Sequence, residues 1–298
     1  MKTKLYIIYN PTAGQRKKKQ LGLVLHSLKN LNVFPVLLKT EHAGHATTLA
    51  HSVANQKGVT IVAAGGDGTV AEVAAGLIGT DARLGIIPIG TANVLAHEFS
   101  IPSEPDAIAK ILTGSDARVL WPGIVDTQSG KRNLFVQMVS VGFDAQVVDT
   151  INLALKKIIG RYAYVVQALR ELVRYKFSPL HVEVDGKTYK ATGAIISKGR
   201  FYGGKYVISE NANAEEPSFI VTILQKKGII FILKICIALS KNRLNKLSGV
   251  ICTKAENVRI FNPDNLPIQA DGDIICKKSI IIHNSNQKIF LAAPSKQI

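Results

Sequence analysis

The 298-residue sequence has few cysteines and lacks long apolar runs. Its three cysteines are far apart and odd in number, so they provide no metal-ligand spacing and suit a reducing compartment. The longest apolar run, residues 228–239, contains Lys234 and is too short to span a bilayer. The apolar run at residues 5–8 is too short for a secretory signal. We therefore expect a cytoplasmic protein that contacts membranes only peripherally.

Acidic residues are scarce relative to basic ones, and the imbalance is concentrated in the second half. The chain has 37 Lys and Arg against 21 Asp and Glu, a net charge of +16. Residues 1–145 contain 14 basic and 10 acidic residues, whereas residues 146–298 contain 23 and 11. The sequence has no recognition-helix, zinc-finger or aromatic ribonucleoprotein pattern. We therefore expect the second half to meet anionic lipid and not nucleic acid.

Short apolar strands alternate with amphipathic helices in the first part of the chain. Strands are expected over residues 5–9, 33–39, 61–64 and 84–87. This alternation predicts a parallel, doubly wound sheet, in which ligands bind at the carboxyl ends of the strands. We therefore expect the loops that follow these strands to converge on one edge of the sheet. Ser103 and Asp106 are spaced like a capping box for a further helix.

The stretch Gly65-Gly66-Asp67-Gly68-Thr69 joins one of these strands to a helix. Glycines permit positive φ and close approach of the backbone to a ligand, and a helix N-terminus offers unpaired N–H groups. The stretch therefore predicts a phosphate cradle, in which the Asp67 carboxylate needs a cation or a proton as partner. The alternative is an ordinary Asp-Gly turn capped by Thr69.

Beyond about residue 121 the pattern changes to strands joined by short turns, which predicts a second, mainly antiparallel β domain. One amphipathic helix is expected over residues 155–174, with its apolar side packed on that domain; the alternative is burial of that side in lipid, and in either case the basic residues of the helix are candidates to face a membrane. A second amphipathic segment follows Gly228. The expected strands cover residues 133–141, 181–184, 191–197, 219–224, 258–261 and 274–283.

Six short motifs occur in order along nearly the whole chain. They are Asn10-Pro11-x-x-Gly14, Thr40 with Gly44-His45-Ala46, Gly65-Gly66-Asp67-Gly68-Thr69 with Glu72, Pro88-x-Gly90-Thr91-Ala92-Asn93, Gly142-Phe143-Asp144-Ala145 and Ala270-Asp271-Gly272-Asp273. This series resembles the diacylglycerol kinase and sphingosine kinase family, and most closely its bacterial soluble lipid kinases.

The resemblance implies a fold and an activity. It implies an α/β nucleotide-binding domain over residues 1–124, joined by a returning strand within 288–298, and a β-sandwich lipid domain over 125–287. It also implies ATP in the cleft between them, Mg²⁺, and transfer of the γ-phosphoryl group to a lipid hydroxyl. The acceptor would be diacylglycerol-like, phosphatidylglycerol or a sphingoid base, met at the anionic inner face of the membrane, and a homodimer is a further expectation.

The resemblance also implies roles for individual residues. Asp271 and Asp273 match the acidic motif that usually accepts the hydroxyl proton; some relatives give that role to the aspartate matching Asp67, and we favour the C-terminal pair. Asp144 matches a residue that contacts the lipid head, and Asp67 and Glu216 are candidate metal ligands. The residues expected to contact ATP are Asn10, Pro11, Gly14, Thr40, Gly65, Gly66, Asp67, Gly68, Thr69, Glu72 and Thr91.

Several positions depart from the family pattern. Ala71 replaces an asparagine, Val94 an aspartate and Asp273 a glutamate, and Glu216-Pro217 stands where bacterial relatives have an Asp-Gly pair at a structural Mg²⁺.

Two alternative functions remain open. An NAD kinase shares the Gly-Gly-Asp-Gly-Thr loop, and a non-catalytic lipid- or nucleotide-binding regulator is suggested by the departures.

Overall fold

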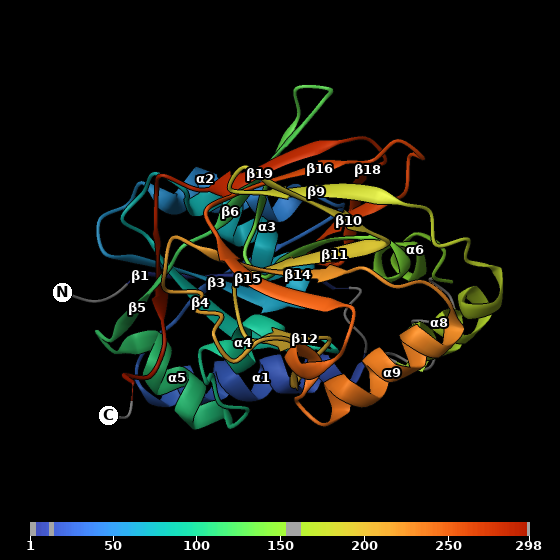
Figure 1. Ribbon diagram of the computed structural model, residues 1–298. Helices are drawn as coiled ribbons and strands as arrows, with labels where there is room; N and C mark the ends of the chain where they lie inside the picture. Colours follow the sequence, from blue (N-terminus) through green and yellow to red (C-terminus); the bar gives the residue numbers. More distant parts are fainter. Residues whose placement is uncertain (1–3, 12–14, 153–161, 297–298) are drawn as a thin grey trace. The chain divides into compact units, whose positions relative to one another are not determined.

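The computed structural model describes residues 4–11, 15–152 and 162–296, and the chain divides into two compact units (Figure 1). Unit 1 comprises Met1–Trp121 together with Asn286–Ile298, and unit 2 comprises Pro122–Ser285. Each unit contains its own buried apolar cluster.

Unit 1 is built on a six-stranded sheet with the order β2-β1-β3-β4-β20-β5. The first five strands run parallel to their neighbours, and only the edge strand β5 is antiparallel. The strands are β1 (Lys4–Tyr9), β2 (Val36–Lys39), β3 (Val59–Gly65), β4 (Arg83–Pro88), β5 (Ala117–Leu120) and β20 (Ile289–Ala292). The chain therefore returns to the first unit for its last strand.

Helices cover both faces of this sheet, which confirms the predicted doubly wound fold (Figure 1). On one face, α1 and α5 pack together over a core that includes Ile7 and Val62. On the other face, α3 packs on β3 and β4 and also contacts α2. The helices are α1 (Gln15–Asn30), α2 (His45–Ala54), α3 (Asp67–Leu77), α4 (Val94–Glu98) and α5 (Pro105–Thr113).

The capping box predicted before α5 is wrong. The helix begins one residue later than expected, with Glu104 as its N-cap, and no side chain caps it. The Asp106 carboxylate instead accepts a hydrogen bond from Ser27 Oγ at 2.5 Å, which links α5 to α1. The Asp106 side chain, which the local pattern assigns to the N-terminus of its own helix, therefore bonds to a residue of a neighbouring helix instead.

Unit 2 contains two six-stranded antiparallel sheets, and one apolar cluster contains residues from both, as the predicted β-sandwich requires. The first sheet has the order β10-β9-β16-β19-β6-β7, and the second β15-β14-β11-β8-β17-β18. The first contains β6 (Gly123–Thr127), β7 (Arg132–Phe135), β9 (Leu180–Val184), β10 (Lys187–Ala191), β16 (Asn257–Phe261) and β19 (Ile280–Asn284). The second contains β8 (Met138–Val141), β11 (Gly193–Ser197), β14 (Phe219–Leu224), β15 (Val250–Ala255), β17 (Ile268–Ala270) and β18 (Asp273–Cys276), and a small ribbon pairs β12 (Phe201–Tyr202) with β13 (Tyr206–Val207).

Two stretches predicted as single strands are each divided between the two sheets. Residues 133–141 form most of β7 and then β8, and residues 274–283 form most of β18 and then β19. The apolar pattern continues through both breaks because each strand has an inward face on the same core. The predictions of single strands are therefore wrong at the points where the chain changes sheets.

The helices of unit 2 are α6 (Phe143–Asp149), α8 (Tyr162–Arg174) and α9 (Ile229–Ser240), followed by the short turn η1 (Leu244–Lys246). Phe231, Ile232 and Ile235 of α9 join a second apolar cluster with Met138 and Ile195, side chains of β8 and β11. Among the residues whose placement is described, no helix is both long enough and apolar enough to cross a membrane.

The prediction that α8 packs its apolar side on the sandwich is wrong. Within the described part of the predicted helix, Val165 and Leu169 are exposed. The buried side chains of α8 include Gln167 and Glu171, which are both polar. The first part of the predicted helix, residues 155–161, lies outside the described residues.

Candidate functional site

Four loops of unit 1 leave the carboxyl ends of neighbouring parallel strands and lie at one edge of the sheet. The Thr40 N–H donates to Tyr9 O at 3.0 Å, and the Asn10 N–H donates to Ala64 O at 3.3 Å. These bonds join the loops after β1, β2 and β3. The expected convergence of the strand-end loops is therefore present within this unit.

The loop after β3 lies directly against the loop after β4. A Cβ built on Gly90 would lie 2.6 Å from Gly66 Cα, and one built on Gly65 would lie 2.4 Å from the Thr69 side chain. No glycine of these two loops is among the described residues with positive φ. Close approach of two backbones, and not an unusual φ, is therefore what requires glycine here.

Asp67 is the first residue of α3, and its Oδ1 accepts a hydrogen bond from the Val94 N–H at 2.7 Å. Val94 begins α4, and the preceding Asn93 has a φ of 49° and donates from Nδ2 to Gly90 O at 3.2 Å. The Asp67 carboxylate thus holds the N-terminus of α4. Because the donor is a backbone N–H, valine at position 94 keeps this contact.

Glu72 lies one turn further along α3 and binds the N-terminus of α2. Its two carboxylate oxygens accept hydrogen bonds from the Gly44 N–H at 2.9 Å and the Ala46 N–H at 3.1 Å. Two of the N–H groups that a helix end leaves unpaired are therefore satisfied. These contacts orient the loop before α2 against α3.

The remaining residues expected at the nucleotide site are distributed around the same edge. Pro11 follows Asn10 at the end of β1, and the exposed Thr91 lies between Gly90 and α4. Gly68 and Thr69 are in the first turn of α3. Gly14 is outside the described residues.

In unit 2, the acidic turn between β17 and β18 contains two aspartates in different surroundings. Asp271 has a φ of 48° and is only 8% exposed, whereas Asp273 is exposed at the start of β18. The Asp271 carboxylate accepts three backbone N–H bonds, from Val136 at 2.7 Å and from Gln137 and Met138 at 2.9 Å each. Asp271 therefore holds the segment in which the chain changes from β7 to β8.

Asp144, in the first turn of α6, is part of a polar network that reaches the same turn. Ser140 Oγ and Tyr202 OH both donate to its carboxylate. Gln269 Nε2 donates to Asp144 Oδ2 at 3.3 Å, and Gln269 Oε1 accepts the Gly272 N–H at 2.8 Å. Burial, together with the negative charge of Asp144, raises the pKa of Tyr202 well above its usual value, so its hydroxyl remains a donor.

Sequence reasoning missed Ser140, Tyr202 and Gln269. Gln269 directly precedes the Ala270-Asp271-Gly272-Asp273 motif, but nothing in that motif relates it to a residue on another strand. Ser140 is fully buried in β8 and lies within an apolar run, where a lone serine carries no functional signal. Ser140 and Gln269 come together because β8 and β17 are paired neighbours in one sheet, and Tyr202 reaches Asp144 from β12.

Glu216 does not have the surroundings of a Mg²⁺ ligand. Its Oε2 forms an ion pair with Lys254 at 2.7 Å, and its Oε1 accepts from Asn213 Nδ2 at 2.9 Å. Its backbone oxygen accepts from the ammonium group of Lys198, a fully buried side chain, at 2.9 Å. A metal ion at this position therefore does not fit, because Lys254 and Asn213 already bind the carboxylate of Glu216 and Lys198 binds its backbone oxygen.

The Lys198 ammonium group has three oxygen acceptors, which match its three N–H donors. Besides Glu216 O, these are Ser218 O at 2.9 Å and Asn284 Oδ1 at 3.0 Å, and the ring centroid of Phe219 lies 4.8 Å away. Burial lowers the pKa of Lys198 to about 7, and the charge of Glu216 opposes this shift. Across the part of the chain that the structure describes, no group of three His, Cys, Asp or Glu side chains could hold a metal.

Comparison with known proteins gives consistent matches along the chain. Residues 4–121 match the family model described as the diacylglycerol kinase catalytic domain, and residues 137–287 match the one described as the YegS C-terminal NAD kinase beta sandwich-like domain. A diacylglycerol kinase of Staphylococcus aureus is 27% identical over 99% of this chain and 94% of its own, and one of Bacillus subtilis is 29% identical over 90% and 88%. A crystal structure of a putative diacylglycerol kinase from Bacillus anthracis has the same fold, with a TM-score of 0.77 at 20% identity over 98% of this chain and 96% of that one.

Proposed function

This chain belongs to the diacylglycerol kinase family of lipid kinases, and we propose that it transfers the γ-phosphoryl group of ATP to the hydroxyl group of a diacylglycerol-like lipid. The observation that supports this best is the edge of unit 1 where four strand-end loops meet the start of α3. We propose unit 1 as the nucleotide-binding domain and unit 2 as the lipid domain, with limits near residues 124 and 288.

The start of α3 would bind the phosphates of ATP. The first N–H groups of a helix lack intrahelical partners and carry partial positive charge, which suits anionic oxygens. Gly66 and Gly90 keep side chains out of the contact between the two loops, and Gly65 leaves room for the Thr69 side chain. Residues of the surrounding loops, among them Asn10, Pro11, Thr40, Gly68, Thr69 and Thr91, would contact the rest of the nucleotide.

Asp67 is the residue that would hold Mg²⁺. This ion is commonly bound by one or two carboxylates together with substrate phosphates, so a dedicated cluster of acidic side chains is not required. When bound, it neutralises charge on the phosphates during transfer. The bond from the Val94 N–H holds Asp67 Oδ1 in place beside the phosphate-binding loop.

We assign different roles to the two aspartates of the acidic turn. Asp273 is exposed and would accept the proton of the lipid hydroxyl. The oxygens of Asp271 are already used by three N–H donors, so Asp271 would position the turn. Asp144 would contact the lipid head, held by Tyr202 and Gln269.

The test is phosphoryl transfer from labelled ATP with Mg²⁺ to vesicles that contain diacylglycerol, phosphatidylglycerol or sphingoid base, with products identified by mass. We expect labelled phosphatidic acid, and we expect Asp67→Asn and Asp273→Asn to abolish it. Asp264→Asn, an exposed aspartate in the loop before β17, is the matched control. The proposal fails if no lipid is labelled.

The same experiment separates the two alternative functions. The model matched by residues 137–287 is described as NAD kinase-like, so NAD is included as an acceptor. Formation of NADP in preference to any phosphorylated lipid would favour an NAD kinase. Binding of ATP or vesicles without any product would favour a non-catalytic regulator.

A further inference from the structure

Two helices of unit 2 expose apolar side chains along one face each. On α8, Val165, Leu169 and Val173 are 56%, 59% and 80% exposed, and on α9, Ile230 and Ile237 are 71% and 56% exposed. Tyr162 on α8 and Leu233 on α9 continue the same two rows, since positions three and four residues apart share a helix face. The two helices contact each other. We call these two rows, with the pocket between them, the α8–α9 surface.

The polarity of α8 is inverted relative to an ordinary surface helix, which buries its apolar stripe and exposes its polar face. Its inner side carries Gln167 and Glu171, each 8% exposed. Gln167 Nε2 donates to Glu171 Oε1 and to Thr150 Oγ1, both at 3.0 Å, and Gln146 Nε2 donates to Glu171 Oε2 at 3.4 Å. The polar side is therefore satisfied inside the protein, and the apolar row faces outward.

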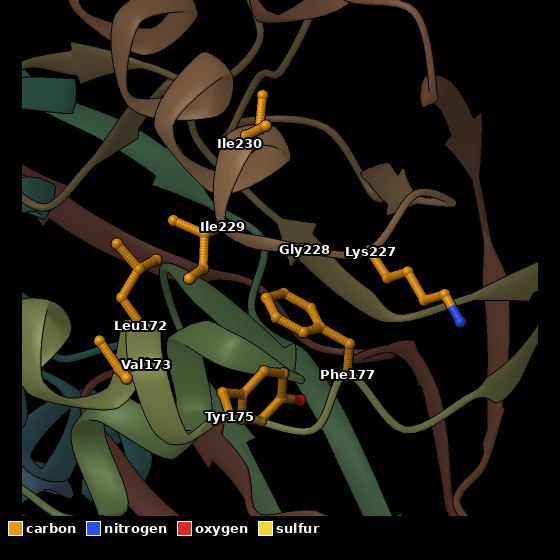
Figure 2. A pocket seen from close by; sticks show the side chains of 8 residues that line it. All are labelled: Leu172, Val173, Tyr175, Phe177, Lys227, Gly228, Ile229 and Ile230. Carbon is orange, nitrogen blue, oxygen red and sulfur yellow. The ribbon is translucent and has the colours of Figure 1, made fainter.

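A pocket of about 540 Å³ lies where the end of α8 meets the start of α9 (Figure 2). Leu172, Phe177 and Ile229 contribute apolar walls, and Tyr175 lies beside Phe177 with their ring centroids 4.9 Å apart. The Tyr175 hydroxyl is buried and has no hydrogen-bond partner among the described residues. Burial raises the pKa of Tyr175 to about 12, so the hydroxyl stays protonated.

The charge around these helices is almost entirely positive. Residues 162–177 and 226–246 together contain nine Lys and Arg and one acidic residue, Glu171. Because Glu171 is buried and hydrogen-bonded to Gln146 and Gln167, it contributes little to the outer surface. A second copy of this chain would bring the same positive charges against these, whereas an anionic lipid surface would attract them.

We propose that the α8–α9 surface docks on a bilayer that contains anionic lipids, with its apolar rows inserted among the lipid chains and its basic residues at the headgroups. Helices that lie in a membrane interface combine these two features. The pocket beside Tyr175 would accept part of one lipid. The inference deepens the proposed function, on which it rests, by naming the surface that meets the lipid phase.

The experiment is co-sedimentation of the full chain, without ATP, with vesicles of phosphatidylcholine alone or mixed with phosphatidylglycerol. We expect binding to the mixed vesicles, weakened by salt, and little binding to the neutral ones. The double variant Ile230→Asp/Ile237→Asp should bind at least about tenfold more weakly, because each inserted isoleucine contributes a comparable factor. Ile281→Asp replaces an exposed isoleucine of β19 and should bind like the wild type.

Circular dichroism and thermal unfolding show whether the variants fold. If the double variant does not, Val173→Asp on α8 makes the same test. Wild-type affinity in a folded variant overturns the proposal, as does a dimer in solution that the double variant dissociates.

Phosphoryl transfer to a short-chain diacylglycerol in detergent micelles is measured separately. An enzyme that is active there but does not bind vesicles contradicts only the docking surface. One that binds vesicles but transfers no phosphate contradicts only the proposed reaction.

Discussion

Asp271 and Asp273 are two residues apart, but the structure predicts different consequences when each is changed to asparagine. The Asp271 carboxylate accepts two N–H bonds at Oδ1 and one at Oδ2. An amide keeps at most the two bonds to its oxygen and turns its NH₂ group toward the third donor, the Val136 N–H. Asp271→Asn therefore leaves a buried N–H opposed by another donor.

The cost follows from the bonds that change. A buried N–H without an acceptor costs about 1–3 kcal/mol, and the two remaining bonds lose the advantage of a charged acceptor, roughly 1 kcal/mol each. We expect the free energy of unfolding to fall by about 3–5 kcal/mol. For a unit of this size the thermal midpoint should fall by roughly 6–20 °C.

Asp273→Asn should leave the unfolding midpoint unchanged, because the side chain is exposed at the start of β18. It should instead abolish phosphoryl transfer, since an amide cannot accept the proton of the lipid hydroxyl. Urea unfolding followed by tryptophan fluorescence and circular dichroism, together with kcat per folded molecule, measures both effects. Wild-type stability with lost turnover in Asp271→Asn would refute the positioning role and return proton transfer to Asp271.

Four further predictions concern both units. Gly90→Ala should raise the KM for ATP severalfold without affecting vesicle binding, because its Cβ would lie 2.6 Å from Gly66 Cα and separate the two loops. Glu72→Gln should lower the thermal midpoint and the free energy of unfolding by about 1–2 kcal/mol, since one oxygen that accepts an N–H of α2 becomes a donor. Burial lowers the pKa of Lys198 from 10.5 to about 7 in the folded chain. Between pH 7 and pH 10.5 the unfolded chain therefore binds more protons than the folded chain. The free energy of unfolding, from urea titrations, should therefore rise with pH across this window by up to about 1.4 kcal/mol per unit, a rise that Lys198→Met should lack. Addition of Mg²⁺ or EDTA should not shift the thermal midpoint of the wild type, because Lys198 already uses the backbone oxygen of Glu216.

The alternation of strands and helices in the first part of the chain was sufficient to predict the doubly wound sheet. The helices there have one buried face, which a spacing of three to four residues records in the sequence. The central strands are buried on both faces and therefore appear as short continuous apolar runs. The order of the parallel strands then explains why Asn10, Thr40, Gly65 and Gly90 lie at one edge. The predicted β-sandwich was confirmed for the same reason, from short strands joined by turns such as Asp185-Gly186, where both residues have positive φ.

The sequence-based predictions fail where two different structural environments produce the same pattern of apolar residues. Residues 133–141 are mostly apolar, as they would be in one continuous strand, and the long-range hydrogen bonds that Val136 and Gln137 donate to Asp271 mark the break. The apolar row of α8 has the spacing of a buried helix face, and its exposure depends on Gln167 and Glu171 being satisfied on the opposite side.

The sequence by itself determined the two fold classes, the family and the loops that carry the candidate nucleotide site, because these depend on local periodicity and on short ordered motifs. Only the tertiary structure decided how the polar side chains are used. Asp67, Glu72 and Asp271 bind backbone N–H groups of segments far away in the chain, and Lys198 occupies the oxygens beside Glu216. Such contacts form after the strands have paired, and a buried polar group must then take whichever partner the pairing brings within reach.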